Sequence, residues 1–223
     1  MKLYKSSSPA VFQPLRGAKI EGKCIRLREK KISDVRNDYN WQRDPELARF
    51  DAVPVLDLPF ALYLLDYTSE IKKPRRSRFP MAVETLEGKH IGNTTCYEID
   101  EKKKETQFGI MIGDPSYRDK GYGRDVVNTM VGHVFRTTGL NRVYLKTLDW
   151  NLRAQKCFTG CGFTPYDRMR RNGYTFILME MFREQWEKGR SELSEINTHP
   201  DENRSPEDIN PDSGLRRNSK KTE

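Results

Sequence analysis

The stretch that decides the fold is Tyr117-Arg118-Asp119-Lys120-Gly121-Tyr122-Gly123-Arg124. Gly121 and Gly123 carry no side chain, so the backbone can approach a bulky group closely. A helix that began here would add unpaired N–H groups and a partial positive charge, both of which attract anions. The stretch therefore predicts a cradle for phosphate, most simply for a diphosphate.

An apolar segment precedes this stretch and an amphipathic one follows it. Residues 108–112, Phe-Gly-Ile-Met-Ile, are rich in strand formers, and a Gly-Asp-Pro turn closes them. After the glycines, apolar residues recur at helical spacing, and Gly139 stands where the helix would end. These apolar residues are Val126, Val127, Met130, Val131, Val134 and Phe135. The predicted order is strand, glycine loop, helix.

Two other phosphate motifs share this order but not these residues. A P-loop needs Gly-Lys-Ser/Thr, and here Gly123 is followed by Arg124 and an aspartate. A dinucleotide fingerprint needs a third small residue where Val126 stands. The loop resembles instead the acetyl-coenzyme A loop of the GNAT acetyltransferases. Their pattern Arg/Gln-x-x-Gly-x-Gly/Ala is met by Arg118, Gly121 and Gly123.

A downstream segment resembles the same family. It fits the pattern Asn-x-x-Ala-x-x-x-Tyr-x-x-x-Gly-Phe through Asn151, Ala154, Phe158, Gly162 and Phe163, with Phe158 in place of the usual Tyr. Upstream, the matching positions resemble the branch that contains the ribosomal-protein alanine N-acetyltransferases (RimJ/RimL-like). They are residues 25–28, Asp34, Trp41, residues 44–46 and residues 90–93. The resemblance covers roughly residues 20 to 185.

The resemblance implies an α+β GNAT acyl-CoA N-acyltransferase fold, with a central mixed, mostly antiparallel sheet and helices on both faces. Patterning along the chain agrees with it. We expect strands at residues 24–28, 79–85, 91–99, 105–112, 142–147 and 174–181. Besides the helix after the glycine loop, we expect helices at residues 33–41, capped by Ser33, at 60–67 and at 151–160.

The same resemblance implies acetyl-CoA as co-substrate and assigns residues to it. The fourth and fifth strands of the fold splay apart, so that the pantetheine arm pairs with the backbone of Ile110, Met111 and Ile112. The remaining predicted cofactor-binding residues are Arg118, Asp119, Lys120, Gly121, Tyr122, Gly123, Arg124, Asn151 and Phe158. We expect no metal, because no histidine or carboxylate near Cys157 and Cys161 completes a ligand set.

Forming an amide from a thioester requires a neutral amine, a stabilised carbonyl oxygen and a leaving thiolate. The family commonly carries a glutamate where this chain has Gln107, which cannot accept a proton. Glu105, about 7 Å further along the strand at ~3.4 Å per residue, and Glu98 are the candidate bases. Each has the alternative interpretation of an exposed strand residue. Phe158 cannot protonate the thiolate, as the usual tyrosine would.

Composition places the expected boundaries. The chain has 223 residues, of which only 35% are hydrophobic. We predict an N-terminal extension over residues 1–20, the acetyltransferase domain over 21–186 and a disordered polar tail over 187–223, where large aliphatics are too few to offset ordering entropy. A short helical extension before the disordered part is the alternative for the start of the tail. No signal peptide or membrane span is evident, and the cysteines lie in unrelated contexts. We therefore expect a cytoplasmic protein without a membrane partner.

The expected function is transfer of an acetyl group from acetyl-CoA to a primary amine. An α-amine has a pKa near ~7.8 and a lysine side chain one near ~10.4, so at neutral pH a peptide N-terminus or a low-pKa small amine is the easier acceptor. One alternative is an acyl-CoA sensor without transfer. Another is an RNA-associated protein that uses the basic residues 72–78, although such a run is more often a solvated loop, so we do not expect nucleic acid as a partner. The sequence leaves open whether the chain forms a homodimer.

Overall fold

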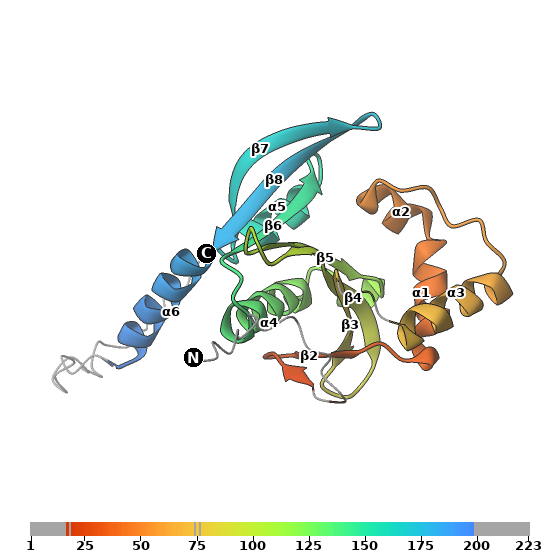
Figure 1. Ribbon diagram of the computed structural model, residues 1–223, viewed down its shortest axis with the longest axis horizontal. Helices are drawn as coiled ribbons and strands as arrows, with labels where there is room; N and C mark the ends of the chain where they lie inside the picture. The colour runs from red at the N-terminus through yellow and green to blue at the C-terminus, as the bar shows by residue number, and fades with distance from the viewer. Residues whose placement is uncertain (1–16, 18, 74, 76, 199–223) are drawn as a thin grey trace, which may run out of the picture. The chain divides into compact units, whose positions relative to one another are not determined.

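The computed structural model describes residue 17 and residues 19–73, 75 and 77–198. Its elements follow one another along the chain as Figure 1 shows. They are β1 (Ile20–Glu21), β2 (Ile25–Glu29), the 3-10 helix η1 (Ile32–Asp34), α1 (Val35–Gln42), α2 (Pro45–Asp51), α3 (Phe60–Lys72), β3 (Arg78–Thr85), β4 (His90–Asp100), β5 (Glu105–Ile112), the 3-10 helix η2 (Pro115–Tyr117), α4 (Tyr122–Thr137), β6 (Arg142–Leu148), α5 (Leu152–Thr159), β7 (Thr164–Arg171), β8 (Tyr174–Phe182) and α6 (Arg183–Thr198). The described residues up to Glu187 belong to one compact unit, and a second unit begins at Lys188.

A single sheet of eight strands organises the first unit. The strand order is β1-β2-β3-β4-β5-β6-β8-β7. All neighbouring strands run antiparallel except β5 and β6, which are parallel. The prediction of a mixed, mostly antiparallel sheet in an α+β fold is therefore confirmed.

Helix α4 covers one face of this sheet. Its apolar residues at helical spacing are all buried, as the sequence predicts. On β2, Ile25 and Leu27 point to the same core. Since successive side chains of a strand point to opposite faces, Arg26 and Arg28 face the other side, where Arg28 meets Asp34 at the start of α1. Helices therefore pack on both faces.

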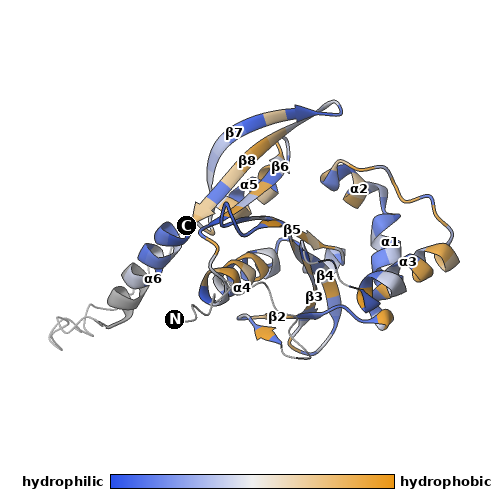
Figure 2. Cartoon of the chain, viewed as in Figure 1, coloured by the Kyte–Doolittle hydropathy of each residue, from blue (hydrophilic) through white to orange (hydrophobic). Residues whose placement is uncertain are grey.

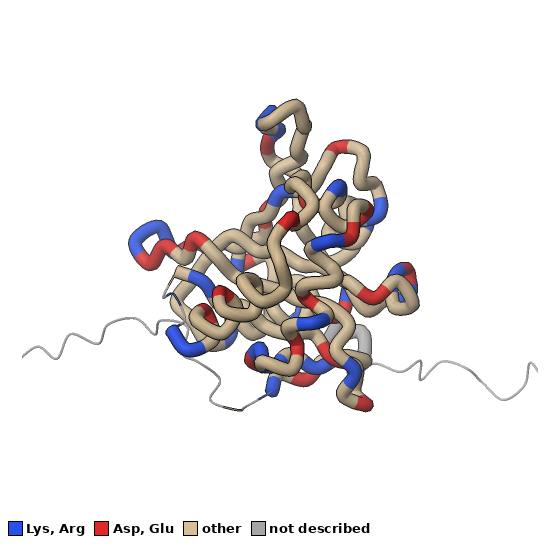
Figure 3. Tube along the Cα trace, turned by 90° about the vertical axis from the view of Figure 1, so that its right-hand side faces the viewer, with Lys and Arg blue, Asp and Glu red and all other residues tan. Residues whose placement is uncertain are grey.

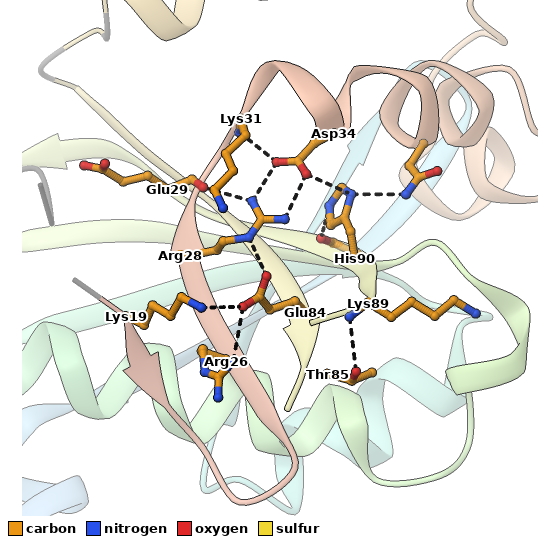
Figure 4. Close-up of polar contacts among 12 residues, drawn as sticks. Lys19, Arg26, Arg28, Glu29, Lys31, Asp34, Glu84, Thr85, Lys89 and His90 are labelled. Carbon is orange, nitrogen blue, oxygen red and sulfur yellow. Dashed lines mark hydrogen bonds and ion pairs between the residues drawn. The ribbon is translucent and has the colours of Figure 1, made fainter. Parts of the chain in front are cut away.

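A buried charged cluster fastens the α1 end of the molecule to the sheet (Figure 4). The Arg28 guanidinium donates to both Asp34 carboxylate oxygens, at 2.7 and 2.8 Å, and to Glu84 at 2.6 Å. Burial opposes ionisation of Asp34, but hydrogen bonds from Arg28 and from the backbone N–H of Lys31 hold its pKa below the ordinary value. A paired and hydrogen-bonded buried charge keeps its position, so this cluster fixes where α1 leaves the sheet.

The chain departs from the predicted pattern at three places. Ser33 is not a helix cap, because a 3-10 turn with Lys31 at its cap position comes before α1. Helix α2 was not predicted, although Asp44 caps it by accepting from the N–H groups of the next turn and Pro45 occupies its first position. Strand β7 was also not predicted. It lies at the edge of the sheet, and its sequence is hydrophilic almost throughout (Figure 2).

Helix α6 extends beyond the predicted end of the domain. It continues to Thr198, so the first part of the segment expected to be a tail is helical. The rest of that segment lies outside the described residues, as does most of the predicted N-terminal extension. Boundaries at residues 21 and 186 remain a prediction.

Candidate functional site

The site begins where β5 and β6 part. The two strands pair only at Glu105–Arg142, Thr106–Val143 and Gln107–Tyr144. Beyond these pairs, residues 108–112 of β5 and 145–148 of β6 line opposite sides of a cavity of about 1010 Å³. Pockets for small molecules and cofactors run from about 300 to 1,000 Å³, so this cavity has room for a large co-substrate and an acceptor.

Most of the predicted cofactor-binding residues meet in this cavity. Its lining includes Ile110, Met111, Ile112, Arg118, Asp119, Gly121, Gly123, Arg124, Asn151 and Phe158. Gly121 precedes α4 with a φ of 86°, a left-handed conformation that favours glycine. Lys120 and Tyr122 are not among the lining residues, and the Tyr122 ring packs edge-on against Tyr117.

Arg118 holds the backbone in place at this end of the cavity. Its guanidinium donates to the carbonyl oxygens of Ile112, at 3.1 Å, and Gly113, at 3.0 Å. It also donates to Glu46 of α2 at 2.7 Å. The Ile112 carbonyl is thus already engaged, and Arg118 joins α2 to the end of β5. A direct phosphate contact of Arg118 remains a prediction.

Two further cations at this end were missed from the sequence. Arg153 and Lys156 of α5 line the cavity together with Arg124. Arg153 lies 3.4 Å from Asp119 and stacks over the ring of Phe50. The helix containing them was predicted, and one turn separates the two residues, so the pattern of basic residues on that helix was the available signal.

Neither candidate base lines the cavity. Glu105 accepts a 2.6 Å hydrogen bond from Arg142, which also binds Glu180 at 2.7 Å. Glu98 accepts from the Tyr144 hydroxyl at 2.9 Å and lies in an irregular part of β4. Both carboxylates have partners outside the cavity, and this arrangement favours a role outside catalysis. Glu98 is an exposed strand residue, as in the alternative interpretation, whereas Glu105 is half-buried.

The other end of the cavity holds acid–base groups that the sequence did not reveal. Asp51, the last residue of α2, is exposed to solvent inside the cavity. Protein atoms nevertheless displace part of the water around it, and this burial raises the pKa of Asp51 to about 6. Apart from Asp119 at the glycine loop, no other described residue that lines this cavity is acidic.

Tyr97 of β4 stands opposite the point where the strands part. The side-chain amide of Gln107 donates to the Tyr97 hydroxyl oxygen at 2.8 Å. A Cβ atom on Gly109 would lie 3.1 Å from the Tyr97 ring, so any larger residue there would press on that ring. Burial, followed by the charges of Glu98 and Asp51, raises the pKa of Tyr97 to about 12. Tyr97 therefore stays protonated and can donate.

Charges of both signs are mixed along the part of the chain that the structure describes. Blue and red segments are interspersed in Figure 3. Of the basic run at residues 72–78, Arg78 lines the cavity, whereas residue 76 lies outside the described residues. None of the described helices is long and apolar enough to cross a membrane.

Comparison with known proteins agrees with this geometry. Residues 25–164 match the family described as "Acetyltransferase (GNAT) domain", which is more than half of the chain. The chain therefore belongs to the GNAT acetyltransferase family, and the predicted GNAT fold and acetyltransferase class are confirmed.

Solved structures share this fold. One is the spermidine N-acetyltransferase from Vibrio cholerae in complex with CoA and spermine, with 19% identity, a TM-score of 0.65 and coverage of 73% of this chain and 97% of that one. Another is the aminoglycoside acetyltransferase AAC(6')-Ib in complex with coenzyme A, with 19% identity, a TM-score of 0.62 and coverage of 74% and 99%. An acetyltransferase of the GNAT family from Bacillus anthracis has 11% identity, a TM-score of 0.63 and coverage of 75% and 99%.

Proposed function

We propose that this chain transfers an acetyl group from acetyl-CoA to a primary amine with a single positive charge, either the N-terminus of a protein or peptide or a small monoamine. The observation that carries this proposal is the set of charged residues in the cavity lining. Arg124, Arg153 and Lys156 come from α4 and α5 beside the glycine loop, and Asp51 of α2 is the one described acidic residue of the lining outside that loop.

The residues present fit acetyl-CoA. A left-handed glycine before α4 leaves its first N–H groups open to a phosphate, and the cations of α5 add to the attraction. The unpaired edges beyond Gln107 and Tyr144 offer backbone hydrogen-bonding groups to an extended arm. When bound, acetyl-CoA supplies the activated acetyl group.

The α2 end suits one ammonium group better than several. Its walls are largely apolar, with Leu47, Phe50, Val53 and Phe176. Asp51 can pair with one ammonium, but a second would approach Arg78 or Lys146, and like charges repel in such a site. We therefore expect spermine and the aminoglycosides, which carry several amines, to be poorer acceptors for this cavity than a monoamine.

Two side chains can move the protons that the transfer requires. Asp51 takes a proton from the acceptor ammonium, which makes the nitrogen a nucleophile. As the C–N bond forms and the C–S bond breaks, Tyr97 gives its hydroxyl proton to the departing sulfur, and the proton lost from nitrogen returns to Tyr97 through the solvent in the cavity. The amide of Gln107 holds the Tyr97 oxygen in place. Tyr97 thus takes the role that Phe158 cannot fill.

The RimJ/RimL-like features support a protein N-terminus over a free small amine, by resemblance alone. An acyl-CoA sensor remains the alternative, because Gln107 and Phe158 replace two common family residues. A groove for RNA has less support, since the cations that line the cavity flank an apolar site.

The test is thiol release from acetyl-CoA with a matched panel of acceptors. The panel compares a peptide with a free N-terminus, the same peptide blocked by acetylation, a blocked peptide with one lysine, a simple monoamine, spermidine and kanamycin. Calorimetry measures acetyl-CoA binding in parallel. We expect turnover with the free N-terminus or the monoamine, and at least tenfold lower kcat/KM for spermidine and kanamycin. Preference for a polyamine overturns the acceptor class, and binding without any turnover favours the sensor.

A further inference from the structure

Two thiols stand beside the glycine loop and take no part in the proposed transfer. Cys157 lies on α5 and lines the cavity. Cys161 lies two residues beyond the end of α5, with its Sγ 3.8 Å from the carbonyl oxygen of Arg124. Both side chains are half-buried, and the two thiols are hydrogen-bonded to each other. A pair of thiols in contact at a ligand cavity is a candidate for chemistry of its own.

The surroundings of Cys157 favour its thiolate. A Cβ atom on Gly123 would lie 3.9 Å from Cys157 Sγ, so the sulfur sits at the first turn of α4, where the helix has a partial positive charge. The Arg124 guanidinium lies near the end of α5, which carries Cys157. A Cβ atom on Gly160, the C-cap residue of that helix, would be 2.8 Å from Arg124 Nη2. The hydrogen bond from Cys161 lowers the pKa of Cys157; burial opposes this effect, and the charge of Arg124 adds to the lowering. Thiols in such surroundings are the reactive ones.

Cys24 provides an internal comparison. It is also half-buried and lies at the same first turn of α4, but it faces Asp125. The Asp125 carboxylate accepts from the Cys24 backbone N–H at 2.7 Å. Burial, followed by the hydrogen bond to Asp125 and its charge, raises the pKa of Cys24 to about 11. Two consecutive helix residues, Arg124 and Asp125, therefore act in opposite directions on the pKa values of two thiols.

We propose that Cys157 is the reactive thiol of this protein and that peroxide joins it to Cys161 in a reversible disulfide. Bound acetyl-CoA blocks the reaction of Cys157, and the disulfide in turn weakens acetyl-CoA binding. The last part rests on the proposed function, since it takes acetyl-CoA as the occupant. Cys157 Sγ stands beside Gly123, and Cys161 Sγ lies 3.8 Å from the carbonyl oxygen of Arg124, so both sulfurs lie at the first turn of α4. This shared position allows the close approach that a disulfide requires.

The oxidation proceeds in two balanced steps. The Cys157 thiolate attacks hydrogen peroxide, an S–O bond forms, the O–O bond breaks and the leaving hydroxide becomes water. Cys161 then loses its proton and attacks the same sulfur, the S–S bond forms and a second water leaves. The two thiols lose two electrons, which reduce one peroxide. A thiol such as dithiothreitol reverses the reaction by exchange.

The first experiment measures alkylation of the full-length protein by iodoacetamide at pH 7, with the modified cysteines mapped by mass spectrometry. We expect Cys157 to react roughly tenfold or more faster than Cys24, and saturating acetyl-CoA, which has no free thiol, to slow Cys157 at least tenfold without changing Cys24. Equal rates for the two thiols overturn the proposal. Acetyl-CoA at a concentration that calorimetry shows to be saturating, but that leaves the Cys157 rate unchanged, also overturns it, while the proposed function stands. If acetyl-CoA does not bind, the proposed function is wrong, and the two alkylation rates still test the reactivity of Cys157.

The second experiment treats the protein with one equivalent of hydrogen peroxide. In the wild type we expect a Cys157–Cys161 crosslink, a fall of about tenfold in affinity for acetyl-CoA, which has no free thiol, and full recovery with dithiothreitol. Cys161→Ser blocks the crosslink and leaves Cys157 to oxidise further, whereas the matched control Cys24→Ser behaves like the wild type. A wild-type protein that loses acetyl-CoA affinity without this crosslink, or that forms the crosslink and binds acetyl-CoA unchanged, contradicts the proposal.

Discussion

The two ends of the cavity are built in different ways. At the glycine-loop end, the site is formed mainly by the backbone, with a left-handed Gly121, the start of α4 and two strand edges that part. At the α2 end, it is formed by the side chains of Asp51, Arg78 and Tyr97, which come from three elements that are distant in the sequence. The first end can be predicted from a short stretch of sequence, whereas the second forms only when the chain folds.

The largest expected effect comes from Gly121→Glu. A side chain there meets no atom within 4 Å and would place a carboxylate where the phosphates are predicted. We expect acetyl-CoA to bind roughly a thousandfold more weakly, about 4 kcal/mol, by calorimetry. Gly88→Glu is the matched control, because its φ of 93° and its lack of neighbours impose the same backbone strain outside the cavity. Equal losses in both variants would show strain and not site chemistry.

Asp51→Asn tests the α2 end and should be next in size. With the most reactive acceptor, we expect kcat to fall about a hundredfold, and wild-type activity to decline as pH falls below about 6, where Asp51 becomes protonated. The neighbouring Asp57, which is exposed and does not line the cavity, supplies the control Asp57→Asn. A hundredfold loss in the control, or no acid limb in the wild type, would reject the base.

The same variant should change stability in the opposite direction. The pKa of Asp51 is raised on folding, so the folded chain binds its proton more tightly than the unfolded chain does. Ionised Asp51 therefore costs stability at pH 7, and this cost vanishes as pH falls through about 6 toward the ordinary value near 4. Asp51→Asn should raise the Tm at pH 7 and match the wild type at pH 4. A lower Tm at pH 7 would mean that Asp51 holds a structural partner.

Tyr97→Phe should have a smaller effect on turnover. It removes the hydroxyl that Gln107 positions and keeps the ring over Gly109. We expect kcat to fall about tenfold, since a coenzyme A thiolate leaves readily and water can replace part of a general acid. Acetyl-CoA affinity should not change. If Tyr97→Phe reduces affinity instead of kcat, Tyr97 shapes the cavity and donates no proton.

Glu105→Gln should have the smallest effect on catalysis. The side chain binds Arg142 and does not line the cavity, so we expect kcat within twofold of the wild type and a loss of about 1 kcal/mol in unfolding free energy, as for a partly exposed ion pair. Thermal denaturation and thiol release measure the two quantities. A tenfold lower kcat would restore Glu105 as the base.

The sequence predicted the elements that carry a strong local pattern. The glycine loop and α4 combine a backbone requirement with apolar residues at helical spacing, and both lie where they were expected. Strand β7 was missed because both of its faces are largely exposed, so Thr164–Arg171 shows no alternation, and an edge position tolerates Pro165. Asp51 and Tyr97 gave no local signal, because their proximity depends on how α2 and β4 pack.

The edges of β5 and β6 that part after Gln107 and Tyr144 also affect the stability of the protein before acetyl-CoA binds. Unpaired strand edges are templates for association with other chains, and here they belong to the middle of the sheet. A ligand arm laid between them would act as a ninth strand and would hide both edges at once. At a ligand concentration of one hundred times Kd, binding adds about 2.7 kcal/mol to the free energy of unfolding. The co-substrate would therefore protect the folded chain as well as supply its acetyl group.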